Sequence, residues 1–204
     1  MVVMLKALLL IFDPVNTWDK IEKAHRSIIL LVFQFLLPLL LISSAVEAYG
    51  LIRFGRENPM SHRAHPVAQE VVMRYETVQF SFSLLILLGG AWILKKTGEG
   101  FQRRHSYVEC FTTVVYSLSP LFLFRMFNAL PAIDTWICWG VGILFSVSAL
   151  YRGVPRIMKP DPSNALGVYL TACLLFIFLT GLAQFLAMLV LDGKLLAGFW
   201  PQIG

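Results

Sequence analysis

Residues 165–191 read ALGVYLTACLLFIFLTGLAQFLAMLVL, a run that contains no acidic or basic side chain. A helix needs roughly 20 apolar residues to cross the hydrocarbon core of a bilayer, which is about 30 Å thick. The run is long enough for one complete crossing. It therefore predicts a transmembrane helix.

The composition of the whole chain also indicates a membrane protein. Of the 204 residues, 57% are hydrophobic, and the mean hydropathy is +0.71; soluble domains average about 45–50% apolar residues. The apolar residues are gathered in long runs and do not recur with the period of an amphipathic helix or strand. These features exclude a soluble globular domain and predict one membrane domain.

Four further apolar runs resemble residues 165–191. They predict an all-α fold, a polytopic membrane protein built as a bundle of about five transmembrane helices. The expected spans are approximately 28–49, 78–94, 107–130, 136–151 and 165–191, and the third is expected to be interrupted at Pro120. The expected parts are an N-terminal interfacial and cytoplasmic segment (1–27), the five-helix transmembrane domain (28–191) and a short C-terminal tail (192–204).

The N-terminal segment begins with an apolar stretch that is too short to cross a bilayer. Residues 1–12 are followed by polar residues, not by the small-residue cleavage site of a signal peptide. We therefore expect this stretch to be retained as a helix in the membrane interface. Residues 13–27 predict a short amphipathic helix with Trp18 and Ile21 turned toward lipid.

The basic residues lie mostly in loops between the apolar runs. The net charge is +5 and the isoelectric point is near 9.3, but this distribution is typical of topology signals and of contact with anionic lipid. Binding of nucleic acid is therefore not expected. We expect anionic lipid at the cytoplasmic loops.

The distribution of Lys and Arg predicts the orientation. With five spans, one side of the membrane receives eleven of them: Lys6, Lys20, Lys23, Arg26, Lys95, Lys96, Arg103, Arg104, Arg152, Arg156 and Lys159. The other side receives five: Arg53, Arg56, Arg63, Arg74 and Lys194. Because cytoplasmic loops carry the excess of basic residues, the N-terminus is expected in the cytoplasm and the C-terminus outside it.

Arg125 is the one basic residue inside an expected span. A charge near the bilayer centre costs at least about 2.5 kcal/mol, so such a residue usually faces the protein interior or a partner. Two explanations stay open. Arg125 lies five residues before Leu130, so its guanidinium can extend to the outer interface; or it pairs with Glu47, which is expected at the same depth in the first span.

The sequence gives little support for a metal site. His62 and His65 have a spacing that could hold a metal on a helix, with Glu70 or Glu76 as a third ligand. Pro66 follows the pair directly and favours a loop. No metal and no other cofactor is therefore expected.

The sequence also gives no positive case for catalysis. It lacks H-E-x-x-H, G-x-S-x-G and a phosphate-binding glycine loop. Cys110, Cys138 and Cys173 are far apart and form no C-x-x-C pair, which is typical of small buried side chains. We expect no enzymatic activity.

Small residues gather in the fourth expected span. Gly140, Gly142 and Ser146 include a small-xxx-small pattern, which permits close approach of another helix. That helix belongs either to the same bundle or to a partner protein, and both alternatives stay open. Trp92, Trp136 and Trp139 are interpreted as anchors at the membrane interface.

Three short segments resemble motifs of one known family. Residues 111–120, FTTVVYSLSP, are similar to the Tyr-Ser-x-x-Pro segment of the Yip family, the five-helix proteins named for interaction with Ypt/Rab GTPases. Residues 150–155, LYRGVP, resemble the family's Leu-Tyr-x-Gly-Val segment, and Asp13-Pro14 with Trp18 resembles the start of many bacterial members. The motif positions are Tyr116, Pro120, Tyr151 and Gly153.

The resemblance implies a non-enzymatic membrane protein that serves as an adaptor, scaffold or accessory subunit for other integral membrane proteins. It also implies a bacterial-type short member in an inner membrane, since only residues 1–27 precede the first span. GTPase binding is therefore not part of the expectation, whereas an oligomer stays possible. The alternative is a small transporter or permease with a polar path near Arg125, Glu47, Gln34 and Gln184. Few polar residues occur inside the spans, which favours the adaptor.

Overall fold

The computed structural model describes residues 2–24, 26–57, 64–100, 105–161 and 163–193. Its α-helices are α1 (Val2–Phe12), α2 (Pro14–Ala24), α3 (Ile28–Leu31), α4 (Leu37–Arg53), α5 (Gln69–Gly100), α6 (Tyr107–Arg125), α7 (Thr135–Gly153) and α8 (Ala165–Leu191). Two-residue strands β1 (Arg56–Glu57) and β2 (Ala64–His65) pair antiparallel in the loop before α5. The expected all-α class is confirmed.

Five helical segments are long and apolar enough to cross a membrane, as expected. They are Ile28–Arg53, Gln69–Gly100, Tyr107–Ala129, Thr135–Met158 and Ala165–Leu191. The last coincides with the expected fifth span. The second is much longer than expected at both ends, because α5 continues as a helix beyond its apolar part into polar residues.

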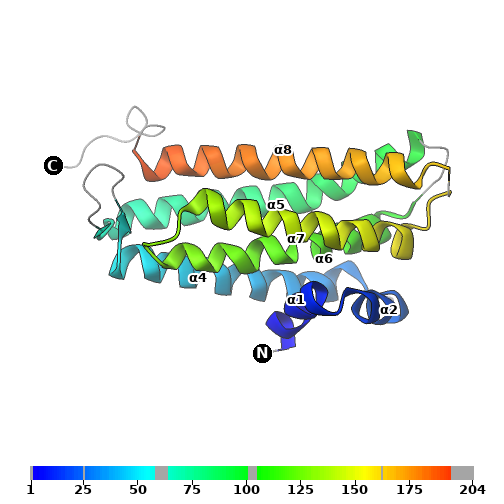
Figure 1. Cartoon of the computed structure of the whole chain (residues 1–204), viewed down its shortest axis with the longest axis horizontal. Coiled ribbons are helices and arrows are strands. Elements are labelled where there is room, and N and C mark those ends of the chain that lie inside the picture. Colours follow the sequence, from blue (N-terminus) through cyan, green and yellow to red (C-terminus); the bar gives the residue numbers. More distant parts are fainter. Residues whose placement is uncertain (1, 25, 58–63, 101–104, 162, 194–204) are drawn as a thin grey trace.

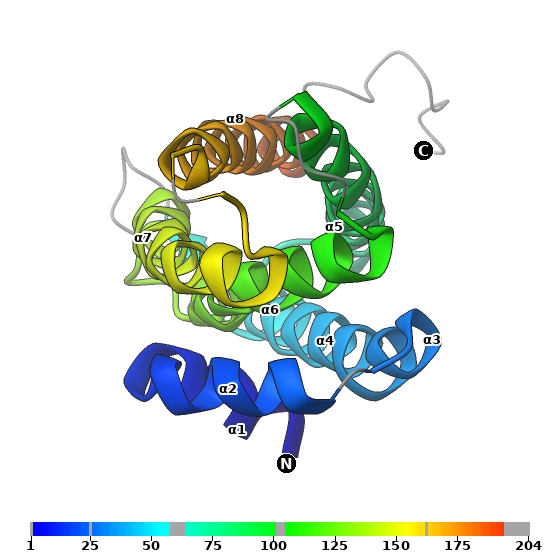
Figure 2. The same ribbon diagram turned by 90° about the vertical axis from the view of Figure 1, so that its right-hand side faces the viewer.

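Helix α6 forms the centre of the bundle. It packs against α4, α5 and α7, while α8 packs mainly on α5 (Figures 1 and 2). In its most apolar part, 72% of the α6 residues are buried, against 33% for α5. Successive spans run in opposite directions, so the C-terminal ends of α4 and α6 and the N-terminal end of α5 share one end of the molecule (Figure 1).

Three prolines inside the spans are accommodated in two ways. Pro38 is the second residue after the π-helical turns Val32–Leu36, and Pro155 lies within a second π-helical segment, Val154–Met158. A proline has no N–H and crowds the carbonyl four residues earlier, so the helix widens there. The third span, by contrast, was expected to be interrupted at Pro120, but α6 continues through it.

The hydroxyl of Ser119 explains this continuity. Its Oγ donates a hydrogen bond of 2.8 Å to the carbonyl oxygen of Tyr116. That carbonyl is the one that an N–H at position 120 would reach in a regular helix. Serine side chains are among the groups that satisfy backbone carbonyls freed by proline in membranes. Ser119 thus satisfies the carbonyl that Pro120 leaves without an N–H donor, and α6 continues as one helix.

The N-terminal helices pack on the bundle beside α4 and α6 (Figure 2). Ala7 and Leu10 of α1 are buried, while Leu5 and Phe12 are exposed. The expectation that Trp18 faces lipid is wrong, because its side chain is completely buried in the main hydrophobic core. Helix α2 therefore docks on the bundle through its largest side chain.

Candidate functional site

Three charged residues are buried inside the spans. Glu47 near the end of α4, Glu76 in the third turn of α5 and Arg125 at the end of α6 are 1%, 7% and 7% exposed. Because these three helices alternate in direction, all three residues lie at the same end of the bundle. A charge in hydrocarbon is costly unless paired, so their meeting satisfies each of them.

Arg125 bridges the two carboxylates. Its Nε donates to Glu47 Oε2, and its Nη2 donates to Glu76 Oε2. The Tyr75 hydroxyl donates to the other oxygen of Glu47 over 2.7 Å, and Asn128 Nδ2 donates to that same oxygen over 2.9 Å. We call Glu47, Tyr75, Glu76, Arg125 and Asn128 the charge network. It links α4, α5, α6 and the turn after α6.

The structure therefore places the side chain of Arg125 inside the bundle and against Glu47. Glu76 was missed as a partner, because the second span was expected to begin at Val78 and Glu76 was considered only as a possible metal ligand. The sequence did contain a signal for it. The stretch before Val78 is already helical in pattern, with Val72, Tyr75 and Gln79 on one face, all buried.

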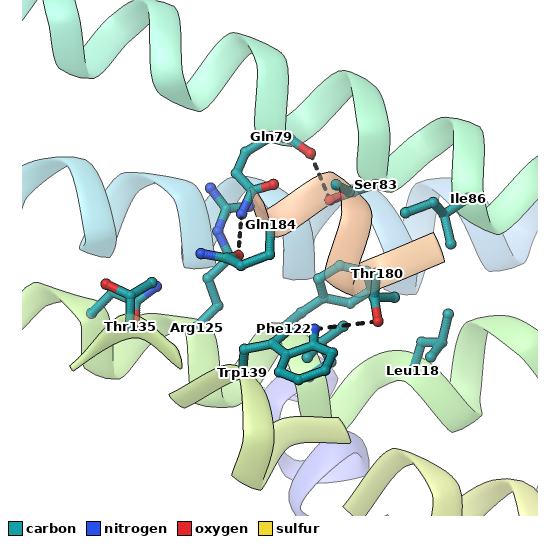
Figure 3. Close-up of a pocket in the computed structure, with 13 residues that line it drawn as sticks. Gln79, Ser83, Ile86, Leu118, Phe122, Arg125, Thr135, Trp139, Thr180 and Gln184 are labelled. Carbon is teal, nitrogen blue, oxygen red and sulfur yellow. Dashed lines mark hydrogen bonds between the residues drawn. The ribbon is translucent and has the colours of Figure 1, made fainter. Parts of the chain in front are cut away.

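A cavity adjoins the charge network in the direction of the bundle centre (Figure 3). Arg125, Asn128, Gln79 and Gln184 line its polar part, and apolar residues such as Leu118 line the rest. It offers about 40 Å³ to the centres of water molecules. That is room for roughly three waters, because one water needs about 10–15 Å³ by this measure.

Hydrogen bonds hold the polar wall of the cavity in place. Gln79 Nε2 donates to Gln184 Oε1 over 2.8 Å, which joins α5 to α8. Trp139 Nε1 donates to Thr180 Oγ1 over 3.3 Å, which joins α7 to α8 (Figure 3). Trp139 is therefore part of the cavity wall, and its place at the membrane interface stays a prediction.

Three buried polar atoms in this wall have no hydrogen-bond partner among the described residues. They are Arg125 Nη1, Asn128 Oδ1 and Gln184 Nε2. Buried polar groups of this kind are usually satisfied by ordered water. The cavity can thus hold water or a very small polar molecule between donors and an acceptor.

The small residues of α7 divide between two faces. Gly142 lies against α6, where an added Cβ would be 3.0 Å from the Leu121 Cα, and Ser146 is buried. Their surface is thus used within the bundle and is not free for a partner. Around Gly140, by contrast, no atom of the described residues lies within 4 Å of an added Cβ.

Two of the four motif positions, Tyr116 and Gly153, contact Trp18 away from the charge network, toward the opposite end of the molecule. The Trp18 ring packs edge-on against Tyr116, with centroids 6.3 Å apart, and an added Cβ on Gly153 would be 2.5 Å from its Cζ2. We call Trp18, Tyr116 and Gly153 the aromatic dock. It fixes α2 to α6 and α7. Tyr151, in contrast, is exposed and contacts Tyr169.

The other candidate residues from the sequence, Gln34, His62 and His65, are not part of the charge network or the aromatic dock. Gln34 is exposed on the surface of the π-helical turns and does not line the cavity. His62 lies outside the described residues, and only the backbone of His65 is described, in β2. Within the described part of the chain, no group of three His, Cys, Asp or Glu residues could hold a metal ion.

Comparison with known proteins gives one match. The family model of the Yip1 domain matches residues 8–183. The matched range begins in α1 and ends within α8, so it includes both the charge network and the aromatic dock. No curated protein and no solved structure gave a significant match.

Proposed function

The chain belongs to the Yip family of membrane proteins, and from this premise we propose that it works without catalysis, as an adaptor or scaffold for other integral membrane proteins. One observation carries the proposal. The three charged side chains that are buried inside the spans are paired with one another in the charge network at one end of the bundle, and they do not form a series across the membrane.

The charge network suits a rigid body better than a moving one. Arg125 holds carboxylates from two different helices, and both are buried. Separating α4 or α5 from α6 would leave an unpaired charge in a medium where it costs several kcal/mol, about 3–5 for a broken buried pair. A bundle that resists separation presents a constant outer surface to its surroundings.

We propose that partners contact the surface around Gln34. Its amide is exposed about two turns inside the first span, by the usual rise of a helix, and it has no hydrogen-bond partner among the described residues. An amide in hydrocarbon lacks water to bond with. A polar residue of a partner helix would satisfy it, as interhelical amide contacts do in other membrane proteins.

Photocrosslinking in cells tests this surface. A photoreactive amino acid at position 34 should give a reproducible adduct with one or a few integral membrane proteins, identified by mass spectrometry. The matched control is position 174, because Leu174 on α8 is likewise exposed but carries no polar group. Equal adduct patterns at both positions would contradict a partner surface at Gln34.

The second candidate is a small transporter, and the cavity beside Arg125 favours it. Gln184 and Arg125 line that cavity, as such a path requires, but Gln34 does not. Purified protein in liposomes should move no labelled solute if the adaptor proposal holds. Flux that depends on Gln184 would overturn the proposal and support transport.

A further inference from the structure

A groove opens where α2, α7 and α8 meet, at the end of the molecule that the charge distribution assigns to the cytoplasm. Val15 and Trp18 line it from α2, and Leu166 and Tyr169 line it from α8. It offers about 620 Å³, which lies within the range of about 300–1,000 Å³ that is usual for ligand sites. It is far larger than the cavity beside Arg125.

The walls of the groove are apolar and its rim is cationic. Tyr151 and Tyr169 pack edge to face, with ring centroids 5.2 Å apart, and Leu166 is 62% exposed. The charged residues that line the groove are Arg152 and Arg156, and both are exposed. The groove thus combines a hydrophobic wall with positive charge at one edge.

The two arginines differ in how far they are already neutralised. Arg156 Nη1 lies 3.2 Å from Asp19 Oδ1, in a pair that is half exposed and therefore weak. Arg152 has no acidic partner among the described residues. One full positive charge and part of a second therefore remain for a ligand.

A buried donor forms an independent second observation. Trp18 is completely buried, and its Nε1 has no hydrogen-bond partner among the described residues. Trp18 is also among the residues that line the groove. Buried indole N–H groups usually have an acceptor. An oxygen atom from a bound molecule would supply it once a small shift of α2 exposes the N–H to the groove.

We infer that this groove binds one anionic glycerophospholipid. Its phosphate lies between Arg152 and Arg156, its ester region reaches toward Trp18, and an acyl chain follows Leu166 and Tyr169 onto α8. A lipid is favoured over another occupant because the wall continues into the exposed apolar face of α8, with Leu170 49% and Leu174 70% exposed. Anionic lipids also concentrate in the cytoplasmic leaflet.

Native mass spectrometry of the full chain tests the site. The purified protein is equilibrated with mixed micelles that contain equal amounts of phosphatidylglycerol and phosphatidylcholine with identical acyl chains. The wild type should retain phosphatidylglycerol preferentially. The variant Arg152→Gln should lower this preference about fivefold, since each basic residue near an anionic surface contributes about 1 kcal/mol, and adding Arg156→Gln should lower it further.

The control removes an equal positive charge from another part of the protein. Lys95→Gln with Lys96→Gln takes two positive charges from the end of α5 on the same expected side, and it should leave the preference unchanged. An equal fall in both double variants would show only general surface attraction. Because Arg152 is exposed and without an acidic partner in the described structure, loss of folding does not explain an effect of its single replacement.

Three other results would overturn the site. They are equal retention of both lipids by the wild type, unchanged retention in the arginine variants, and displacement of the lipid by inorganic phosphate alone. The variant Trp18→Phe adds an independent measurement, because it keeps an aromatic ring and removes the N–H. It should lower retention of both lipids without changing the preference between them.

Discussion

The two ends of the bundle are stabilised by different kinds of interaction. At one end the charge network joins α4, α5 and α6 through a buried guanidinium between two carboxylates. At the other end the aromatic dock joins α2 to α6 and α7 through a tryptophan ring that lies against a glycine. Both contacts are buried, and both join segments far apart in the sequence.

The difference lies in how each end fails. A buried charge that loses its partner keeps its desolvation penalty, so the charge network fails as a unit. A packing contact that is made tighter or looser costs an amount that depends on how far the neighbours can shift. We expect substitutions in the charge network to unfold the bundle, and those in the aromatic dock to release α2 while the bundle stays folded.

The first prediction assigns each end to a side of the membrane. A cysteine introduced at Gln69 or at Lys96, near the two ends of α5, should react with an impermeant maleimide from opposite sides, with Lys96 on the cytoplasmic side; the native Cys110, Cys138 and Cys173 are buried. The expected outcome is all-or-none, because α5 is one continuous helix of 32 residues. Labelling of both positions from one side would contradict five spans, and the reverse pattern would contradict the orientation.

The second prediction tests the charge network. Arg125→Ala leaves Glu47 and Glu76 buried without a cation, so the free energy of unfolding in detergent should fall by about 3–5 kcal/mol. Denaturant titration followed by circular dichroism measures it. The double variant with Glu47→Ala should cost less than the two single variants summed, because contacting residues are coupled. Additive losses would mean that the pair contributes nothing specific.

Much of the fold was accessible from the sequence, because a bilayer imposes one length on every crossing. The apolar run 165–191 predicted α8 to the residue. The ends of α5 were not accessible in this way, because a helix that leaves the bilayer continues in water without an apolar signal. Pro120 misled for another reason, since its effect is cancelled by a hydrogen bond from Ser119.

The sites were only partly accessible. Glu47 and Arg125 share a depth, and depth follows from counting along the spans. The burial of Trp18 does not follow from such counting. It depends on Gly153, which is distant in sequence and has no side chain to exclude the ring. An amphipathic pattern shows which residues share a face, but it does not show whether protein or lipid covers that face.

The third prediction tests the aromatic dock. Gly153→Ala places a Cβ within 2.5 Å of the Trp18 ring, which is rigid and surrounded. Docking of α2 should weaken by about 2 kcal/mol, a usual cost of overpacking. Limited trypsin digestion after Lys20 and Lys23 should become faster, while the helical content of the bundle stays unchanged.

The matched control for this change is Gly140→Ala. An added Cβ at position 140 meets no atom of the described residues within 4 Å, so trypsin digestion should proceed at the wild-type rate. Equal acceleration in both variants would show that glycine replacement in α7 loosens the chain generally. The aromatic dock would then not be the contact that holds α2.

The last prediction concerns the link between the two ends, which is α6 itself. Ser119→Ala removes the hydroxyl that donates to the Tyr116 carbonyl, a group that Pro120 cannot reach with an N–H. The free energy of unfolding should fall by about 1 kcal/mol, the usual net value of one hydrogen bond.

Ser81→Ala serves as the control, because Ser81 also donates a hydrogen bond from its hydroxyl to a backbone carbonyl, that of Thr77, on the exposed side of α5. The Thr77 carbonyl lies in a regular helix that contains no proline. Replacing Ser81 should therefore lower the free energy of unfolding by much less than replacing Ser119. If the two variants lost equal stability, the serine before Pro120 would be an ordinary helix residue, and the continuity of α6 would need another cause.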